Sequence, residues 1–204
     1  MSARAPGLRV TGLETEFGVL CAPAGPSEAA KADLPDVERA AALIFRHRPV
    51  GYRSTNLFLP NGGRLYLDIG AHLEYATAEC VSVRDLVAQD QAGRAILADM
   101  ATRAAAGLSQ EGTAVRFHLL ANNTDSAGHT YGCHESYSVP RSLLDATNDA
   151  SGASSETTMA VLTSFLATRP VLVGSGRPLA GGPTEPNDGS RGAGEEAAWG
   201  LSPR

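Results

Sequence analysis

Lysine is almost missing from this chain of 204 residues, in which Lys31 is the single lysine among 17 basic side chains. Because Lys31 lies in no candidate site, a Schiff base on the protein and a lysine-bound phosphate are both excluded. Cysteine is scarce too, and the 3 cysteines are widely spaced with no C-x-x-C pair, which excludes a disulfide framework and a zinc–cysteine site. Any phosphate must therefore be bound by arginine, backbone amides or a metal ion.

Long hydrophobic runs and basic patches are missing as well. The longest strictly apolar run, residues 40–45, is far shorter than the ~20 residues that span a bilayer, and the first residues lack the apolar core of a signal peptide. The formal net charge of −5, with no basic stripe or aromatic platform, argues against nucleic acid or an anionic membrane as a partner. We therefore expect a cytoplasmic protein with neither kind of partner.

What the chain does contain is typical of a folded globular protein, with 43% hydrophobic and 19% charged residues. Apolar spacings of three, four and seven predict a long helix, and Ser82 with Asp85 three places later resembles a capping box. The alternation of element types favours an α+β domain with a largely antiparallel sheet. The expected strands are 9–21, 64–70, 115–121, 132–139 and 171–173, and the expected helices are 33–46, 82–108 and 155–168.

The chain changes character near residue 174. Glycine and proline become dense from there on, which predicts a flexible connector, and apolar residues resume around Trp199. We expect residues 1–176 to form the ordered domain. Residues 177–204 are expected to be a connector followed by the start of a truncated element.

Polar and apolar residues alternate along the predicted strand 64–70. A strand sends alternate side chains to opposite faces, so one face of this strand would belong to the core and the other would be polar. An exposed sheet face is the ordinary explanation for one such alternation. The polar set is Arg64, Tyr66 and Asp68, and the apolar set is Leu65, Leu67 and Ile69.

The first predicted strand repeats this pattern with two carboxylates, Glu14 and Glu16. They would lie about 7 Å apart on one face, given a rise of ~3.4 Å per residue, and would repel one another. A hard cation such as Mg²⁺ would turn the repulsion into ligation. Arginine side chains from a neighbouring strand are an equally good explanation from spacing alone.

Further carboxylates, amides and imidazoles follow in residues 70–80 and 122–135, at the ends of expected strands, where one cleft can gather them. P-loop, dinucleotide-binding and serine-hydrolase motifs do not occur. A metal–nucleotide site built from carboxylates remains, with Arg64 as a phosphate partner.

Three segments together, residues 12–18, 61–80 and 122–135, closely resemble the Pup ligase/Pup deamidase family, which belongs to the glutamine synthetase-like carboxylate–amine ligases. The resemblance runs from about residue 12 to 176. It implies a glutamine synthetase-like, largely antiparallel sheet with helices packed on one face. Members of the family are more than twice as long as this chain, so the resemblance implies the N-terminal portion of such an enzyme.

The resemblance implies ATP-dependent ligation of Pup, a small protein modifier, to lysines of target proteins, which marks them for proteasomal degradation. ATP and Mg²⁺ would be the cofactors, and Pup and lysine-bearing targets the partners. The LDIG segment at 67–70 resembles the ligase more than the deamidase. A Pup deamidase/depupylase remains the alternative, as does an inactive truncated module that binds Pup or another partner.

The same resemblance assigns roles by motif position. It implies Glu14, Tyr66 and Glu74 as Mg²⁺ ligands, Arg64 and Thr77 as ATP contacts, and Asp68 as the base that deprotonates the attacking lysine. Leu73 stands where the family has a proline, which is expected to loosen a loop that presents Glu74. Additional wall residues without an assigned role are Glu16, Asn123, Asp125, His134 and Glu135.

Overall fold

The computed structural model describes residues 9–25, 34–49, 54–121, 130–140, 153–174, 176–178 and 199–200. The chain divides into two compact units. The first unit comprises Met1–Ala121 and Tyr131–Ser138, and the second comprises Asn122–Thr130 and Val139–Arg204. The first unit holds the main sheet and carries every described residue for which the sequence predicts a site role.

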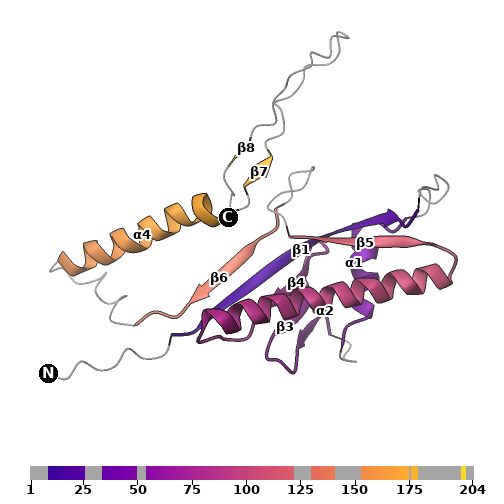
Figure 1. The fold of residues 1–204 in the computed structure, drawn as a ribbon, viewed down its shortest axis with the longest axis horizontal. Helices are drawn as coiled ribbons and strands as arrows, with labels where there is room; N and C mark the ends of the chain where they lie inside the picture. Colours follow the sequence, from indigo (N-terminus) through magenta and orange to yellow (C-terminus); the bar gives the residue numbers. More distant parts are fainter. Residues whose placement is uncertain are drawn as a thin grey trace, which may run out of the picture. The chain divides into compact units, whose positions relative to one another are not determined.

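The main sheet is antiparallel and is built around one long strand, β1 (Thr11–Pro23). Its strand order is β2-β3-β4-β1-β5. The strand β6 also pairs with β1 and lies beside it in Figure 1. On the side of β1 away from β4, β6 pairs with the first half of β1 and β5 with the second half. The remaining strands are β2 (Asn56–Phe58), β3 (Arg64–Leu67), β4 (Leu73–Ala76), β5 (Val115–Leu120) and β6 (Cys133–Tyr137).

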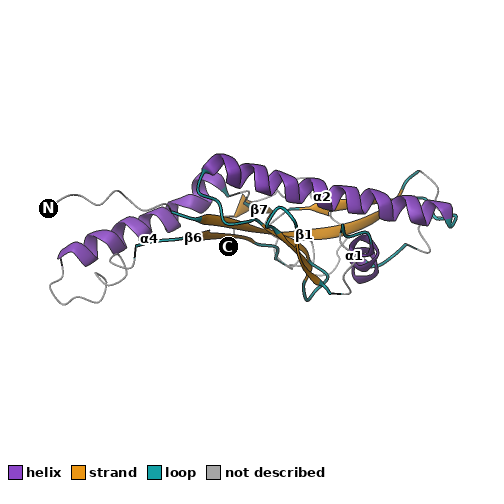
Figure 2. Cartoon of the chain, turned by 90° about the horizontal axis from the view of Figure 1, so that it is seen from below, coloured by secondary structure: helices purple, strands orange, loops and turns teal. Residues whose placement is uncertain are grey.

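Two capped helices, α1 (Val37–Arg46) and α2 (Val83–Gln110), belong to this unit. The predicted cap of α2 is confirmed, because the Ser82 side chain accepts a hydrogen bond from the backbone N–H of Asp85 at 3.1 Å. The first helix begins four residues later than predicted, because Asp36 caps it. Figure 2 shows α2 running along the sheet.

The core lies between the helices and one face of the sheet. The odd-numbered positions of β1 and β3 face it, represented by Phe17 at 4% exposure and Leu65 at 0%. Leu97 and Met100 of α2 pack into the same cluster, as the spacing along that helix predicts. The expected α+β architecture, with helices on one face of a largely antiparallel sheet, is confirmed in the described part of the chain. The opposite face of the sheet is left for the polar residues.

The hairpin that joins β3 to β4 corrects two sequence predictions. Ile69 was assigned to the core face but is 92% exposed, because β3 ends at Leu67 and the chain turns through Gly70 and Ala71, both with positive φ. Leu73 does not loosen a loop. It is fully buried in β4, opposite Phe17 and Leu67, so it anchors the strand that carries Glu74.

The second unit contains the helix α4 (Ala153–Val173) and a two-stranded pair of β7 (Arg177–Pro178) with β8 (Trp199–Gly200). The predicted strand 171–173 is wrong: α4 continues past Pro170 to Val173, and the N–H of Gly174 bonds the carbonyl of Pro170 in the helical pattern. The domain division at residue 176 stays a prediction. No helix within the described ranges is long and apolar enough to cross a membrane.

Candidate active site

The candidate site lies on the sheet face opposite α1 and α2, along two neighbouring rungs. A rung is a set of residues directly opposite one another on adjacent strands. The first rung joins Tyr66 of β3, Glu74 of β4 and Glu16 of β1. Side chains at directly opposite positions point to the same face of a sheet, so the register alone brings these three together.

The second rung, displaced by two residues along each strand, joins Arg64, Ala76 and Glu14. It continues into β6, where His134 is directly opposite Glu14. Because successive even positions share a face, the two rungs form one polar surface across β3, β4, β1 and β6. The predicted pairing of Glu14 with Glu16 on one face is therefore confirmed.

The carboxylates of β1 accept two hydrogen bonds and lie close to two imidazole rings. The Tyr66 hydroxyl donates to Glu14 Oε1, and the backbone N–H of Gly132 donates to Glu16 Oε2 at 2.9 Å. His72 Nδ1 lies 3.4 Å from Glu16 Oε2, and His134 lies 3.7 Å from Glu14 and 3.8 Å from Glu16. Within the residues that the structure describes, no arginine forms an ion pair with Glu14 or Glu16. Pairing with arginines of a neighbouring strand, the alternative to a cation, is therefore not observed there.

One group of side chains in this surface has the spacing of a metal site. Glu16, His72 and Glu74 each offer a ligand atom, and these atoms lie within 4.8 Å of one another. Both carboxylates are buried, with exposures of 7% for Glu16 and 2% for Glu74. A divalent cation with oxygen and imidazole ligands would neutralise the charge that burial makes costly.

The raised pKa of Glu74 also indicates that its negative charge is costly unless a cation or a proton offsets it. Burial, followed by the negative charges of Glu16, Asp68 and Glu14, raises the pKa of Glu74 to about 7, against the opposing effect of its hydrogen bond with Tyr66. Burial and the hydrogen bonds to the two carboxylates raise the pKa of Tyr66 above its usual range. Tyr66 is therefore a neutral phenol at physiological pH, whereas Glu74 is close to its midpoint.

Arg64 supplies positive charge beside these acids. Its guanidinium lies over the Tyr66 ring, 4.2 Å from the centroid, and its Nε donates to Asn56 Oδ1 at 2.7 Å. The side chain is half-exposed on the same face as the carboxylates. An arginine that is anchored at Nε and stacked on an aromatic ring presents its terminal nitrogens to an anion at low conformational cost.

Two predicted site residues lie outside this cluster. Asp68 follows the end of β3 and its N–H bonds the carbonyl of His72, so it lies in the turn rather than on the strand. Its negative charge nevertheless contributes to the raised pKa of Glu74. The Thr77 hydroxyl accepts from the backbone N–H of Leu13 at 3.0 Å, which ties β4 to β1. The contact of Thr77 is therefore structural, and the two residues predicted to bind ATP, Thr77 and Arg64, do not lie together in one group.

The remaining wall residues divide into separate groups. Glu16 and His134 belong to the polar surface described above. Glu135 is the next residue of β6 after His134, so its side chain leaves the sheet on the other face, and it accepts a hydrogen bond from the Tyr137 hydroxyl. Asn123 and Asp125 lie outside the described residues.

Sequence reasoning assigned no role to His72, which the hairpin places against Glu16. Its ring contacts the ring of Tyr131 in a tilted arrangement, with centroids 4.7 Å apart and planes at 38°. Tyr131 in turn covers Gly18, where a Cβ would lie 2.9 Å from the tyrosine ring. The only sequence signal was the position of His72 two residues before Glu74, which puts both on one face if the strand extends that far.

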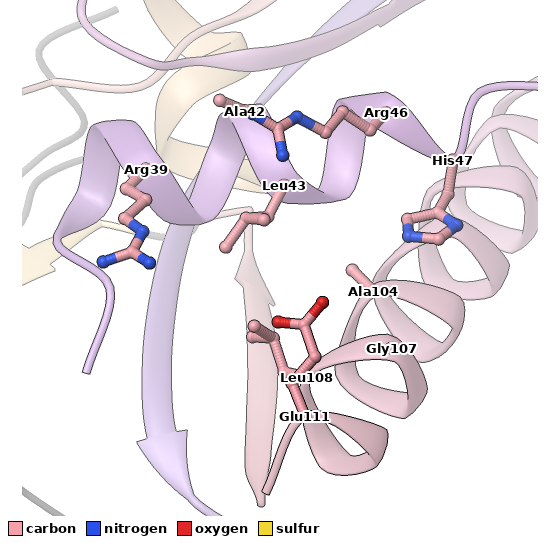
Figure 3. Close-up of a pocket in the computed structure, with 9 residues that line it drawn as sticks. All are labelled: Arg39, Ala42, Leu43, Arg46, His47, Ala104, Gly107, Leu108 and Glu111. Carbon is pink, nitrogen blue, oxygen red and sulfur yellow. The ribbon is translucent and has the colours of Figure 1, made fainter. Parts of the chain in front are cut away.

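A cavity elsewhere in the same unit is not part of this site. It has a volume of about 420 Å³ and lies between α1 and α2 (Figure 3). Leu43 and Leu108 point into it, and Arg39, Arg46 and Glu111 stand around it. None of the clustered carboxylates lines this cavity, so the chemistry of the sheet face does not depend on it.

Comparison with known proteins gives consistent results. The model of the family described as Pup-ligase protein matches residues 9–204. A Pup–protein ligase of Xylanimonas cellulosilytica is 46% identical over 173 residues, which are 84% of this chain and 34% of the relative. A Pup–protein ligase of Jonesia denitrificans is also 46% identical, over 169 residues, which are 83% of this chain and 34% of that relative. These names favour the ligase over the deamidase.

Solved structures show the same likeness. A crystal structure of the complex between the prokaryotic ubiquitin-like protein Pup and its ligase PafA is 35% identical, with a TM-score of 0.67, covering 87% of this chain and 33% of that one. A structure of the Pup ligase PafA in complex with ADP is 38% identical, with a TM-score of 0.50, covering 72% of this chain and 28% of that one. The chain thus spans about a third of the length of the relatives it matches.

Proposed function

The chain belongs to the Pup-ligase protein family, and on that premise we propose that its polar sheet face is the metal- and nucleotide-binding part of a Pup–protein ligase site. The observation that carries this proposal is the buried pair Glu16 and Glu74 on one rung, beside Glu14 and Arg64 on the next. Three carboxylates on one face form a site for a divalent cation, and the arginine beside them is suited to a phosphate.

The donor set fits Mg²⁺. Glu16 and Glu74, whose ligand atoms lie within 4.8 Å of one another and of His72, and Glu14 on the next rung would hold the ion through carboxylate oxygens, the ligands that Mg²⁺ prefers. Tyr66 donates its hydroxyl hydrogen to Glu14 and keeps a neutral oxygen, so it is the weakest of the predicted ligands in this geometry. The bound ion would neutralise the phosphate oxygens of ATP and the carboxylates that surround it.

The proposed reaction has two steps. A γ-carboxylate oxygen of the C-terminal glutamate of Pup attacks the γ-phosphorus of ATP, ADP leaves, and an acyl phosphate forms. The lysine Nζ of a target protein then attacks the acyl carbon, the bond to the phosphate oxygen breaks, and an isopeptide bond and inorganic phosphate result. Arg64 would orient and neutralise the phosphates in the first step.

Asp68 is proposed as the base of the second step. A lysine amine is protonated at neutral pH and cannot attack until it loses a proton. The turn after β3 puts Asp68 beside the acidic cluster but outside the Glu16, His72 and Glu74 group. A carboxylate that does not ligate the ion remains free to accept the proton. Thr77 would contact ATP by donating its hydroxyl hydrogen to a phosphate oxygen, because the backbone N–H of Leu13 occupies a lone pair of the hydroxyl and leaves the O–H available.

A gel assay tests this function on the longest native form that contains these residues. The reaction contains Pup with a C-terminal glutamate, ATP, Mg²⁺ and a lysine-bearing target. We expect an isopeptide-linked conjugate and stoichiometric ADP release, and loss of both when Mg²⁺ is chelated. Release of Pup from preformed conjugates without new conjugation would reject the ligase and establish a depupylase.

A further inference from the structure

Tyr75 lies on the helix side of the sheet, on the face opposite the carboxylates Glu14, Glu16 and Glu74. It is 2% exposed and is opposite Leu65 of β3 and Thr15 of β1. This rung lies between the two rungs that carry the polar surface. In β4, Tyr75 lies between Glu74 and Ala76, and Ala76 is directly opposite Arg64.

The Tyr75 ring fits a slot that only glycine can form. A Cβ at Gly63 would lie 2.3 Å from the Tyr75 oxygen, and a Cβ at Gly93 would lie 2.2 Å from the ring. Gly63 is the last residue of the β2–β3 turn and immediately precedes Arg64, whereas Gly93 belongs to α2. The ring is thus held between the turn that leads into Arg64 and the long helix.

A closed set of hydrogen bonds fixes the hydroxyl end of this slot. Asn61 Nδ2 donates to the Tyr75 oxygen at 2.9 Å, and the Tyr75 hydroxyl donates to Gln89 Oε1 at 2.9 Å. Gln89 Nε2 returns a bond to the Asn61 carbonyl at 2.9 Å. Asn61 Oδ1 accepts from the N–H of Gly63 at 3.0 Å, so the set reaches the residue before Arg64.

We propose that Asn61, Tyr75 and Gln89 form a positioning clamp that fixes the β2–β3 turn against α2 and thereby places Arg64 for phosphate binding. The clamp rests on the proposed function, because it gives Arg64 its role. The three residues touch no substrate and act through the backbone of Gly63. The clamp reaches the residue before Arg64 through the bond between Asn61 Oδ1 and the N–H of Gly63, whereas none of its hydrogen bonds is made with Glu14, Glu16 or Glu74.

The clamp is tested with two variants that break its hydrogen bonds. Tyr75→Phe removes the two bonds of the hydroxyl, and Gln89→Met removes the bonds that Gln89 makes with Tyr75 and Asn61. Gln91→Met is the matched control, because Gln91 is exposed on the same helix and contacts Asp90. Calorimetry at a temperature where circular dichroism shows every variant folded measures affinity for ATP with Mg²⁺ and for Mg²⁺ alone. We expect both clamp variants to bind ATP about five- to tenfold more weakly, a loss of binding free energy comparable to the net contribution of one hydrogen bond. Mg²⁺ affinity and the control stay unchanged.

Other outcomes overturn the clamp or separate it from the proposed function. A lower melting temperature with unchanged ATP affinity would mean that the three residues only stabilise the fold, and the clamp is rejected. If the longest native form that contains these residues binds no ATP, the proposed function fails, and amide hydrogen exchange at Gly63 decides the clamp. Exchange at least about tenfold faster in both variants supports a turn fixed by this network. Unchanged exchange rejects it.

Discussion

Glu16 of β1 and Glu74 of β4 lie directly opposite one another with both side chains buried. Like charges at opposite positions destabilise a sheet, and burial increases the cost. Neither residue can turn to the other face, because the neighbouring Phe17 and Tyr75 fill it. The pair is therefore stable only when a proton, an imidazolium or a cation offsets the charge, and the site is stabilised by what it binds.

The first prediction concerns pH and stability without divalent cations. The pKa of Glu74 rises from 4.5 to about 7 on folding, so the folded chain binds this proton more tightly than the unfolded chain. The stabilisation is complete below pH 4.5 and is lost as the pH rises through 7. Glu74→Gln removes this dependence. At pH 8 the free energy of unfolding of the variant should be about 1 to 3 kcal/mol larger than that of the parent chain.

Urea denaturation at pH 4.5 and pH 8, with a chelator present, measures this difference. Asp99→Asn is the control, because Asp99 forms an exposed ion pair with Arg103 on α2 and should change stability by less than about 1 kcal/mol at either pH. An advantage of Glu74→Gln that is equal at the two pH values would show that Glu74 does not carry the titration.

The second prediction couples the metal to the same proton. Mg²⁺ needs the carboxylate form of Glu74, so binding must release the proton that Glu74 holds below pH 7. Mg²⁺ affinity should rise by up to about tenfold per pH unit between pH 5 and 7 and level off above. Calorimetry in two buffers with different ionisation enthalpies counts the protons released. Affinity that does not change over this range would contradict the assignment of Glu74 as a ligand.

The third prediction separates the base from the nucleotide site. Asp68→Asn keeps the size of the side chain but cannot accept the lysine proton, so the rate of conjugation should fall by about 10² to 10⁴. ATP affinity with Mg²⁺ should change by less than about threefold, because Asp68 lies outside the Glu16, His72 and Glu74 group. An equal loss of ATP binding and conjugation would reject Asp68 as the base.

The fourth prediction uses two glycines of α2. A Cβ at Gly93 would lie 2.2 Å from the Tyr75 ring, whereas a Cβ at Gly107 meets nothing within 4 Å. Gly107→Ala should stabilise the chain by about 0.5 to 1 kcal/mol through helix propensity. Gly93→Ala should destabilise it by about 1 to 3 kcal/mol despite the same gain, because the ring must move. Thermal unfolding checks both, and equal shifts would refute the close packing of Tyr75.

The polar face and the long helix could be predicted from the sequence because each follows a local period. Glu14 and Glu16 share a face by strand alternation, and the apolar residues of α2 follow the helical repeat. Both signals survive in the structure because the core lies on the side that the pattern indicates.

The turn between β3 and β4 could not be predicted in the same way. It depends on positive φ at Gly70 and at Ala71, and an alanine gives no local signal for that conformation. Without the turn, the extent of β3 was overestimated, Ile69 was placed in the core, and β4 was missed. The position of His72 beside Glu16 depends on this hairpin, so no local pattern could give it.

At the end of α4 a local sequence signal is present but predicts the wrong structure. Val171 and Val173 favour a strand, and Pro170 suggests a break. The structure continues the helix to Val173, because a single missing N–H removes one bond while the next turn closes through Gly174. Continuation of an existing helix therefore outweighs the local preference of a few β-branched residues.

The central claim is that the buried carboxylates of the sheet face hold the metal that binds ATP. Calorimetric titration of the longest native form that contains these residues with ATP, in Mg²⁺ and in chelator, tests it most directly when repeated for Glu74→Gln and the control Asp99→Asn. The account predicts binding that requires Mg²⁺, persists in Asp99→Asn and weakens by at least about tenfold in Glu74→Gln. Binding of equal strength in Glu74→Gln, or binding that is unaffected by chelation, would contradict it.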